Sequence, residues 1–200
     1  MEIKKITSNK YIDCNSYIVI SENECIIIDP SFNFEEIIKY VKDFTVKYIL
    51  LTHCHIDHIY DVKRLSEKVC AKVIGSKNLS INILNKTIRF DDLFNVKYEH
   101  RKIDMILEEE KNYFFGNKSF KIIETMGHTN CSICILIKDS LFSGDTIFSH
   151  GSHGRVNFIT SNAFDMKQSI KKILNLDENI VVYPGHGENT TIKDYKRIYM

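Results

Sequence analysis

The stretch VKYILLTHCHIDH, residues 46–58, decides the fold and the chemistry expected of this chain. Its first six residues form a mostly apolar run typical of a buried strand. Side chains two residues apart on an extended backbone point to the same side, so His53 and His55 would face one cavity. A helix beginning near residue 57 would turn Asp57 and His58 toward the same cavity. These four side chains predict a metal site, because imidazole nitrogen and carboxylate oxygen suit borderline metals such as zinc.

A polar surface loop is the alternative interpretation of residues 53–58. The cluster directly follows an apolar strand, where imidazoles without hydrogen-bond partners would be costly. A metal site is therefore favoured over a loop. Cys54 lies between two of the histidines and would point to the opposite face, so we expect it to pack in the core.

Three later motifs have the same character. His128 lies in a GHT motif, Asp145 in GDT and His186 in PGHG, each where a predicted strand ends. The glycines beside them allow tight turns close to a ligand. Each residue alone would be an ordinary turn residue. With residues 53–58 they complete a set of five histidines and two aspartates.

Around these motifs, apolar strand patterns alternate with amphipathic helix patterns. The predicted strands cover 17–20, 25–28, 46–51, 71–74, 103–107, 113–115, 119–124, 133–137, 141–142 and 180–183. The predicted helices cover 34–41, 59–69, 79–84 and 163–174, with a closing helix capped by Thr190 or Thr191. Strand groups that are each followed by helices predict an α/β fold, a four-layer αββα sandwich of two packed sheets with helices outside.

Length and charge set the broader expectations. A chain of 200 residues without linker or repeat predicts a single domain over 1–200, in which residues 77–102 are the hardest to assign and could cover the site. The net charge of +1 gives no field that would recruit nucleic acid or an anionic membrane. Neither a signal peptide nor a membrane helix is recognisable, so we expect a cytoplasmic protein; its oligomeric state is open.

The six cysteines are expected to be reduced and mostly buried, because the chain is too large for a disulfide miniprotein. Cys131 and Cys134 form a CxxC motif at a predicted strand start. Without a second cysteine pair a zinc knuckle is not expected, and a redox pair is the lesser alternative.

The motifs THCHIDH, GHT, GDT and PGHG, in this order and at these intervals, resemble the signature of the metallo-β-lactamase superfamily. The resemblance covers nearly the whole chain, from Asn15-Ser16-Tyr17 to Glu188-Asn189-Thr190-Thr191. Within the superfamily the sequence is most similar to glyoxalase II-like hydrolases, the hydroxyacylglutathione hydrolases, through Thr146-Ile147-Phe148 and Gly154-Arg155. His58 stands where many true metallo-β-lactamases have arginine.

The resemblance implies a role for each candidate ligand. His53, His55 and His128 would hold metal one, Asp57, His58 and His186 would hold metal two, and Asp145 would bridge them. Two divalent ions are expected, zinc first, with iron or manganese as alternatives. Two cations about 3.5–4 Å apart lower the pKa of a shared water, so a bridging hydroxide exists near neutral pH. Asp57 could also orient this nucleophile.

Residues near the expected substrate are less determined. Arg155 stands where related sequences place a basic residue near the substrate, and substrate contact or a structural salt bridge would both fit. His150 and His153 lie in the same loop and are interpreted as rim residues. Full-length glyoxalase II enzymes add a helical C-terminal region that grips glutathione. This region has no counterpart in the 200 residues, which leaves the thiol carrier open.

The leading hypothesis is hydrolysis of a small thioester, because a thiolate leaves with little acid help. Similar sequences perform persulfide dioxygenation with one iron, which His53, His128 and Asp145 would hold here. Phosphodiester cleavage is a third possibility, which the near-neutral charge disfavours. Non-catalytic binding is disfavoured because all seven ligands are present.

Overall fold

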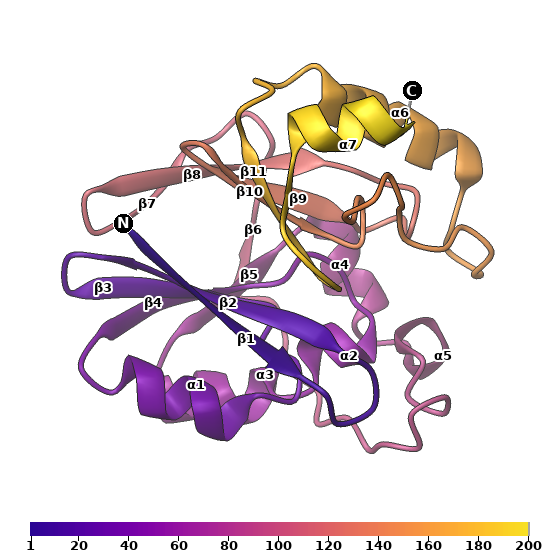
Figure 1. Cartoon of the computed structure of the whole chain (residues 1–200). Helices are drawn as coiled ribbons and strands as arrows, with labels where there is room; N and C mark the ends of the chain where they lie inside the picture. The colour runs from indigo at the N-terminus through magenta and orange to yellow at the C-terminus, as the bar shows by residue number, and fades with distance from the viewer. Residues whose placement is uncertain (200) are drawn as a thin grey trace.

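The computed structural model describes residues 1–199 and contains two sheets of six strands each (Figure 1). The first sheet has the order β1-β2-β3-β4-β5-β6, with β1 Glu2–Ser8, β2 Cys14–Ser21, β3 Glu24–Ile28, β4 Thr45–Leu50, β5 Lys72–Gly75 and β6 Met105–Ile106. The second has the order β12-β11-β10-β9-β8-β7, with β7 Tyr113–Phe115, β8 Lys118–Glu124, β9 Ile133–Ile137, β10 Ser140–Gly144, β11 Val181–Pro184 and β12 Thr190–Thr191.

The longer helices cover the outer faces of the two sheets, and the shorter ones lie at one end of them (Figure 1). Five precede the second sheet along the chain: α1 Phe34–Val41, α2 Ile56–Ile59, α3 Val62–Val69, α4 Lys77–Asn82 and α5 Lys86–Arg89. Two follow β10 and β12: α6 Ala163–Leu174 and α7 Ile192–Tyr199. Within residues 1–199, every helix is too short or too polar to span a lipid bilayer.

The central strands β2 and β3 of the first sheet are mostly apolar runs with two buried faces, because successive side chains point to opposite faces. One face packs against the second sheet, where Tyr17 and Ile26 share a core with Phe120. The ring centroids of Tyr17 and Phe142 lie 5.2 Å apart across the two sheets. Burial of side chains of this size stabilises the fold by about 1.5–3 kcal/mol each.

Two further cores lie between each sheet and its helices. Ile18, on the other face of β2, packs with Ile37 of α1. On the second sheet, Leu141 of β10 packs with Ile170 of α6 and Tyr195 of α7. The layers are therefore helix, sheet, sheet, helix, which confirms the predicted αββα sandwich.

Several predicted elements differ from the observed ones. The helix predicted over 59–69 is wrong as a single element, because the chain breaks into α2 and α3. Asp61 lies in that break, where its Oδ2 accepts a hydrogen bond from the Phe34 N–H at 2.9 Å and so caps α1. The strand predicted over 103–107 is shortened to β6. The strand β1 has no counterpart among the predicted elements, because most of its residues are only partly buried.

Segments from both sheets meet at one edge. The parallel strands β10 and β11 end side by side, where the Gly185 N–H donates to Gly144 O at 2.8 Å. The Ile133 N–H donates to Thr52 O at 2.9 Å and joins the start of β9 to the segment after β4. The start of β2 joins the same edge through the Asn15 N–H, which donates to Gly185 O at 2.8 Å. The predicted ligands all lie on these segments.

Candidate metal centre

The first ligand group consists of His53, His55 and His128. His53 and His55 follow the end of β4, and His128 lies between β8 and β9, so both sheets contribute. One nitrogen of each ring lies within 4.8 Å of those of the other two, and His55 Nδ1 and His128 Nε2 are 2.9 Å apart. All three side chains are buried.

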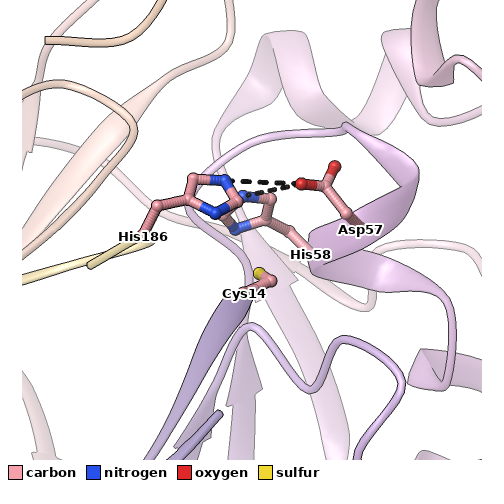
Figure 2. A group of neighbouring side chains, drawn as sticks. All are labelled: Cys14, Asp57, His58 and His186. Carbon is pink, nitrogen blue, oxygen red and sulfur yellow. Dashed lines mark ion pairs between the residues drawn. The ribbon is translucent and has the colours of Figure 1, made fainter. Parts of the chain in front are cut away.

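The second ligand group consists of Asp57, His58 and His186 (Figure 2). Asp57 and His58 lie in the short helix α2, and His186 follows β11. Asp57 Oδ2 lies 3.4 Å from His186 Nε2 and 3.6 Å from His58 Nε2. Cys14, at the start of β2, joins this group with its sulfur within 4.8 Å of the other three ligand atoms.

Asp145 lies between the two groups. Its Oδ1 is 3.3 Å from His58 Nε2, and its Oδ2 is 3.4 Å from both His128 Nε2 and His186 Nε2. The carboxylate therefore contacts a histidine of each group, as a bridging ligand must. The structure thus brings all seven predicted ligand side chains together.

Two glycines allow this close packing. Gly144 has φ +48°, and a Cβ there would lie 2.5 Å from Thr52 Oγ1. A Cβ at Gly185 would lie 2.4 Å from Asp145 Oδ1 and 2.6 Å from His58 Cε1. Any side chain at either position would push a site residue out of place, which explains the glycine before Asp145 and before His186.

Outer hydrogen bonds set the orientation of the imidazoles. Three histidines donate their Nδ1–H to an acceptor: His58 to Asp29 Oδ2 at 2.9 Å, His128 to Arg155 O at 2.9 Å, and His186 to Asp13 O. Carboxylate and carbonyl oxygens only accept, so the hydrogen is on Nδ1 in each case. In the neutral rings, the Nε2 lone pair then points into the site.

Asp29 and Thr52 extend this arrangement to His53. The Thr52 hydroxyl donates to Asp29 Oδ2 at 2.6 Å, and the Thr52 N–H donates to Asp29 Oδ1 at 2.8 Å. With its hydrogen used, Thr52 Oγ1 accepts from His53 Nδ1 at 3.0 Å, which leaves His53 Nε2 for the site. Asp29 therefore orients one histidine of each ligand group.

The inner atoms of the site lack partners of their own. His53 Nε2, His58 Nε2 and Asp145 Oδ1 are buried without a hydrogen bond. Each such atom costs about 1–3 kcal/mol when nothing pairs with it. Imidazole nitrogens and a carboxylate are donors that zinc and iron accept. The residues present therefore fit divalent metal ions.

The two groups differ in protonation when no cation balances them. Burial lowers the pKa of His53 and His128 and lowers that of His55 to about 3, so the first group is neutral. Burial also lowers the pKa of His186, but neighbouring carboxylates, that of Asp145 first, outweigh burial and raise it to about 11. Burial raises the Asp145 pKa, yet His186 and other histidine neighbours hold it well below its usual range. Without a bound cation, a protonated His186 thus balances the negative charge of the carboxylates at the second group.

The predicted substrate residue Arg155 lies at the surface. Its guanidinium lies 5.0 Å from the centre of the Phe158 ring, and its Nε donates to Asn157 Oδ1 at 3.3 Å. Its carbonyl, rather than its side chain, contacts a ligand histidine. His150 and His153 are exposed, and neither belongs to a ligand group within residues 1–199.

The segment 77–102 reaches the site through Phe90. Its ring centroid lies 4.7 Å from that of His55 and 4.7 Å from that of Phe158. The Phe158 ring lies 5.7 Å from that of His128. Two phenylalanines therefore contact the first ligand group.

The cysteines of the CxxC motif lie in different cores. Cys131 packs with Cys54 in the core between the first sheet and its helices. Cys134 packs in the core below α6 and α7. All are free thiols, so the two cysteines of the motif are not paired and Cys54 packs as predicted.

Three residues of the site were not predicted from the sequence to take part in it: Asp29, Thr52 and Cys14. Asp29 and Thr52 each follow a buried strand directly, which is the same signal that identified His53. Cys14, the first residue of β2, precedes the strand predicted over 17–20 and has no local signal, because only the fold brings it to His186.

Two packed sheets between helices, with histidine and aspartate donors at their common edge, define a metal-binding αββα protein. The chain belongs to the metallo-beta-lactamase superfamily, whose family model matches residues 11–186. It is accordingly a hydrolase of a superfamily that binds divalent metals through such clusters.

Three known proteins illustrate the relationship. Hydroxyacylglutathione hydrolase 1 of Vibrio vulnificus is 33% identical over 178 residues, which cover 88% of this chain and 62% of that protein. The BLEG-1 B3 metallo-beta-lactamase structure has a TM-score of 0.91 at 28% identity, covering 98% of this chain and 97% of that one. The structure of TTHA1623 in a di-iron-bound form has a TM-score of 0.85 at 25% identity, covering 98% of both chains. The fold is thus shared over nearly the whole length.

Proposed function

We propose that this chain hydrolyses a small thioester with two divalent metal ions, zinc in the first place, one in each ligand group. The observation that carries the proposal is the position of Asp145. Its carboxylate oxygens lie 3.3–3.4 Å from His58, His128 and His186, so one side chain joins both groups. Two ions bound there would acidify a water and polarise the thioester carbonyl.

The protein side chains have separate tasks in this proposal. The histidines hold the ions with ring nitrogens that their outer hydrogen bonds keep in place. Asp57 both binds in the second group and accepts a hydrogen bond from the attacking water, which orients that water. Arg155 lies at the surface beside Phe158, and its guanidinium would meet an anionic part of the substrate.

The surroundings of the site favour a leaving group that is stable as an anion. The aromatic neighbours are Phe90 and Phe158 at the first group and Phe148 at the second, with the Phe148 ring 5.8 Å from that of His186. A phenyl ring cannot give a proton to a leaving group. A thiolate needs little such help, because the ordinary pKa of its thiol is about 8.5.

The Vibrio hydroxyacylglutathione hydrolase supports the thioester class. This chain spans 62% of that protein, so the thiol carrier is not taken over from it. We therefore extend the proposal to small acyl thioesters in general, with hydroxyacylglutathione as the first substrate to assay.

The test combines metal analysis with three assays on the same preparation: thioester hydrolysis, oxygen uptake on glutathione persulfide, and β-lactam hydrolysis. We expect about two ions per chain and release of free thiol from S-lactoylglutathione. Asp145→Asn should lose metal and at least about 100-fold in kcat/KM, because even indirect partners of metal ligands are worth 10–100-fold in metal affinity or activity. Asp139→Asn is the matched control, since Asp139 is an exposed aspartate at the other end of β10.

Two outcomes would overturn the proposal. A single iron per chain with oxygen uptake on glutathione persulfide, and no thiol release, would identify a dioxygenase instead. Hydrolysis of a β-lactam without hydrolysis of any thioester would place the chain with the B3 enzyme that shares its fold.

A further inference from the structure

The thiol of Cys14 lies among the ligand atoms of the second group but has no task in the proposed function. Cys14 is the first residue of β2, and its side chain has no exposed surface. Its sulfur lies within 4.8 Å of the ligand atoms of Asp57, His58 and His186, and Figure 2 shows it beside the two imidazoles.

Hydrogen bonds on both sides of Cys14 hold it at this place. The Asn15 N–H donates to Gly185 O at 2.8 Å, and the Asn15 side-chain amide donates to Pro184 O at 2.9 Å and to Gly187 O at 3.0 Å. On the other side, His186 Nδ1 donates to Asp13 O. The start of β2 and the PGHG loop are therefore joined residue by residue, with Cys14 facing the site.

A second observation concerns the imidazole beside this thiol. His58 is fully buried, and its Nε2 makes no hydrogen bond, although Asp145 Oδ1 lies 3.3 Å away and its Nδ1 is held by Asp29. The His58 ring is thus aimed at the space that the Cys14 sulfur, Asp57 and His186 also face.

We propose that Cys14 is a further protein ligand of the second metal position, where two imidazoles, the Asp57 carboxylate and one thiolate would bind a zinc, cobalt or ferrous ion beside the shared Asp145. This inference rests on the proposed metal-dependent function. On binding, the S–H bond is replaced by a sulfur–metal bond and the proton passes to solvent, with no change of oxidation state. Thiolate is a soft ligand, so the position should favour these ions over magnesium, calcium and manganese.

The proposal makes the two positions chemically unequal. Asp57 and Cys14 together bring two negative charges to the second position, in addition to its share of Asp145, and so at least balance a divalent ion. The first position has three neutral imidazoles and only a share of Asp145. The ion in the first position would then keep more of its charge and be the stronger Lewis acid.

Cobalt is the probe, because a cobalt–thiolate bond gives a near-ultraviolet charge-transfer band that imidazole and carboxylate ligands do not give. Metal-free full-length protein is titrated with cobalt(II) while absorption and bound cobalt are measured. We expect two cobalt ions per chain, with the charge-transfer band appearing as the second position fills. Cys14→Ser should keep the visible cobalt bands, lose the charge-transfer band and bind the second ion at least about tenfold more weakly.

The matched control is Cys25→Ser, since Cys25 is an equally buried thiol on the neighbouring strand β3 and belongs to none of the ligand groups in residues 1–199. The charge-transfer band of Cys25→Ser should equal that of the unmodified protein. Two cobalt ions without a charge-transfer band in the unmodified protein would overturn the thiolate ligand and leave the metal site standing, whatever the folding of the variants. A band that persists in Cys14→Ser would also overturn it. Failure to bind cobalt at all would overturn the proposed function together with this inference.

Discussion

The two ligand groups differ in chemistry and in surroundings. The first ligand group has only imidazoles, is buried, and has Phe90 and Phe158 against its rings. The second ligand group adds a carboxylate, and His186 keeps 21% of its side-chain surface exposed. One group is thus enclosed by apolar rings, while the other lies nearer to solvent.

This difference indicates a division of labour. Neutral ligands leave the charge of a bound cation largely unbalanced, so the first group is suited to polarise a carbonyl. The carboxylate of Asp57 makes the second group suited to hold and orient the attacking water. Asp145 belongs to both groups, so the two tasks are coupled through one side chain.

Removing the metals should remove the function of both groups together. We expect a chelator to abolish thioester hydrolysis and zinc to restore it. Zinc at about 1,000 times its Kd should stabilise the fold by about 4 kcal/mol, which raises Tm by roughly 10 °C. Activity and Tm that do not respond to the chelator would show that the buried unpaired nitrogens are no metal site. Magnesium, which the donor set disfavours, is the control ion.

Single ligand deletions should separate the groups. His128→Ala removes an imidazole of the first group and His186→Ala one of the second. Each should lower the metal content from about two ions to about one and reduce kcat/KM at least about 100-fold. His100→Ala, at an exposed histidine outside the site, should change neither. Loss of both ions in either variant would show that the groups do not bind independently.

The histidine cluster was predictable because its geometry is local. Residues 53–58 follow directly on β4, so an extended backbone and one helical turn suffice to direct the side chains. The layer order was likewise predictable, since it follows from the alternation of apolar residues. His128, Asp145 and His186 carry weak local signals, and only their common position after strands joined them to the cluster.

The other residues of the site could not be predicted, because their positions depend on contacts between segments that are distant in the sequence. Asp29 orients histidines of both groups because β3 and β4 are parallel neighbours. Cys14 reaches His186 only because the start of β2 pairs with the PGHG loop. Phe90 covers His55 from a segment without a clear pattern. Such positions follow from tertiary packing, which one sequence alone does not reveal.

The hydrogen bonds of Asp29 offer a finer test of the two groups. Asp29→Asn replaces an acceptor of His58 and of the Thr52 hydroxyl by a donor, so both groups should bind zinc about 10–100-fold more weakly. Thr52→Val removes the hydroxyl that contacts His53 and Asp29 but leaves Asp29 in place to hold His58, so it should weaken the first group more than the second. Zinc titration of each variant measures this. Asp61→Asn, at a buried aspartate that caps α1, should lower stability with zinc affinity unchanged. An equal loss of zinc affinity in both groups on Thr52→Val would show that these hydrogen bonds do not act on the two groups separately.

The smallest expected effect concerns the aromatic cover of the first group. Phe158 contacts His55, His128 and Phe90, and the loss of such ring contacts costs about 1 kcal/mol. If the substrate carbonyl meets the first group, Phe158→Ala should raise KM roughly fivefold at unchanged metal content. Phe148→Ala should raise KM less, because Phe148 lies beside His186 of the second group, which is assigned to the attacking water. Ile159→Ala is the control, since that side chain is 77% exposed.

A larger rise in KM for Phe148→Ala than for Phe158→Ala would reverse the roles of the two groups. The substrate carbonyl would then meet the second ligand group.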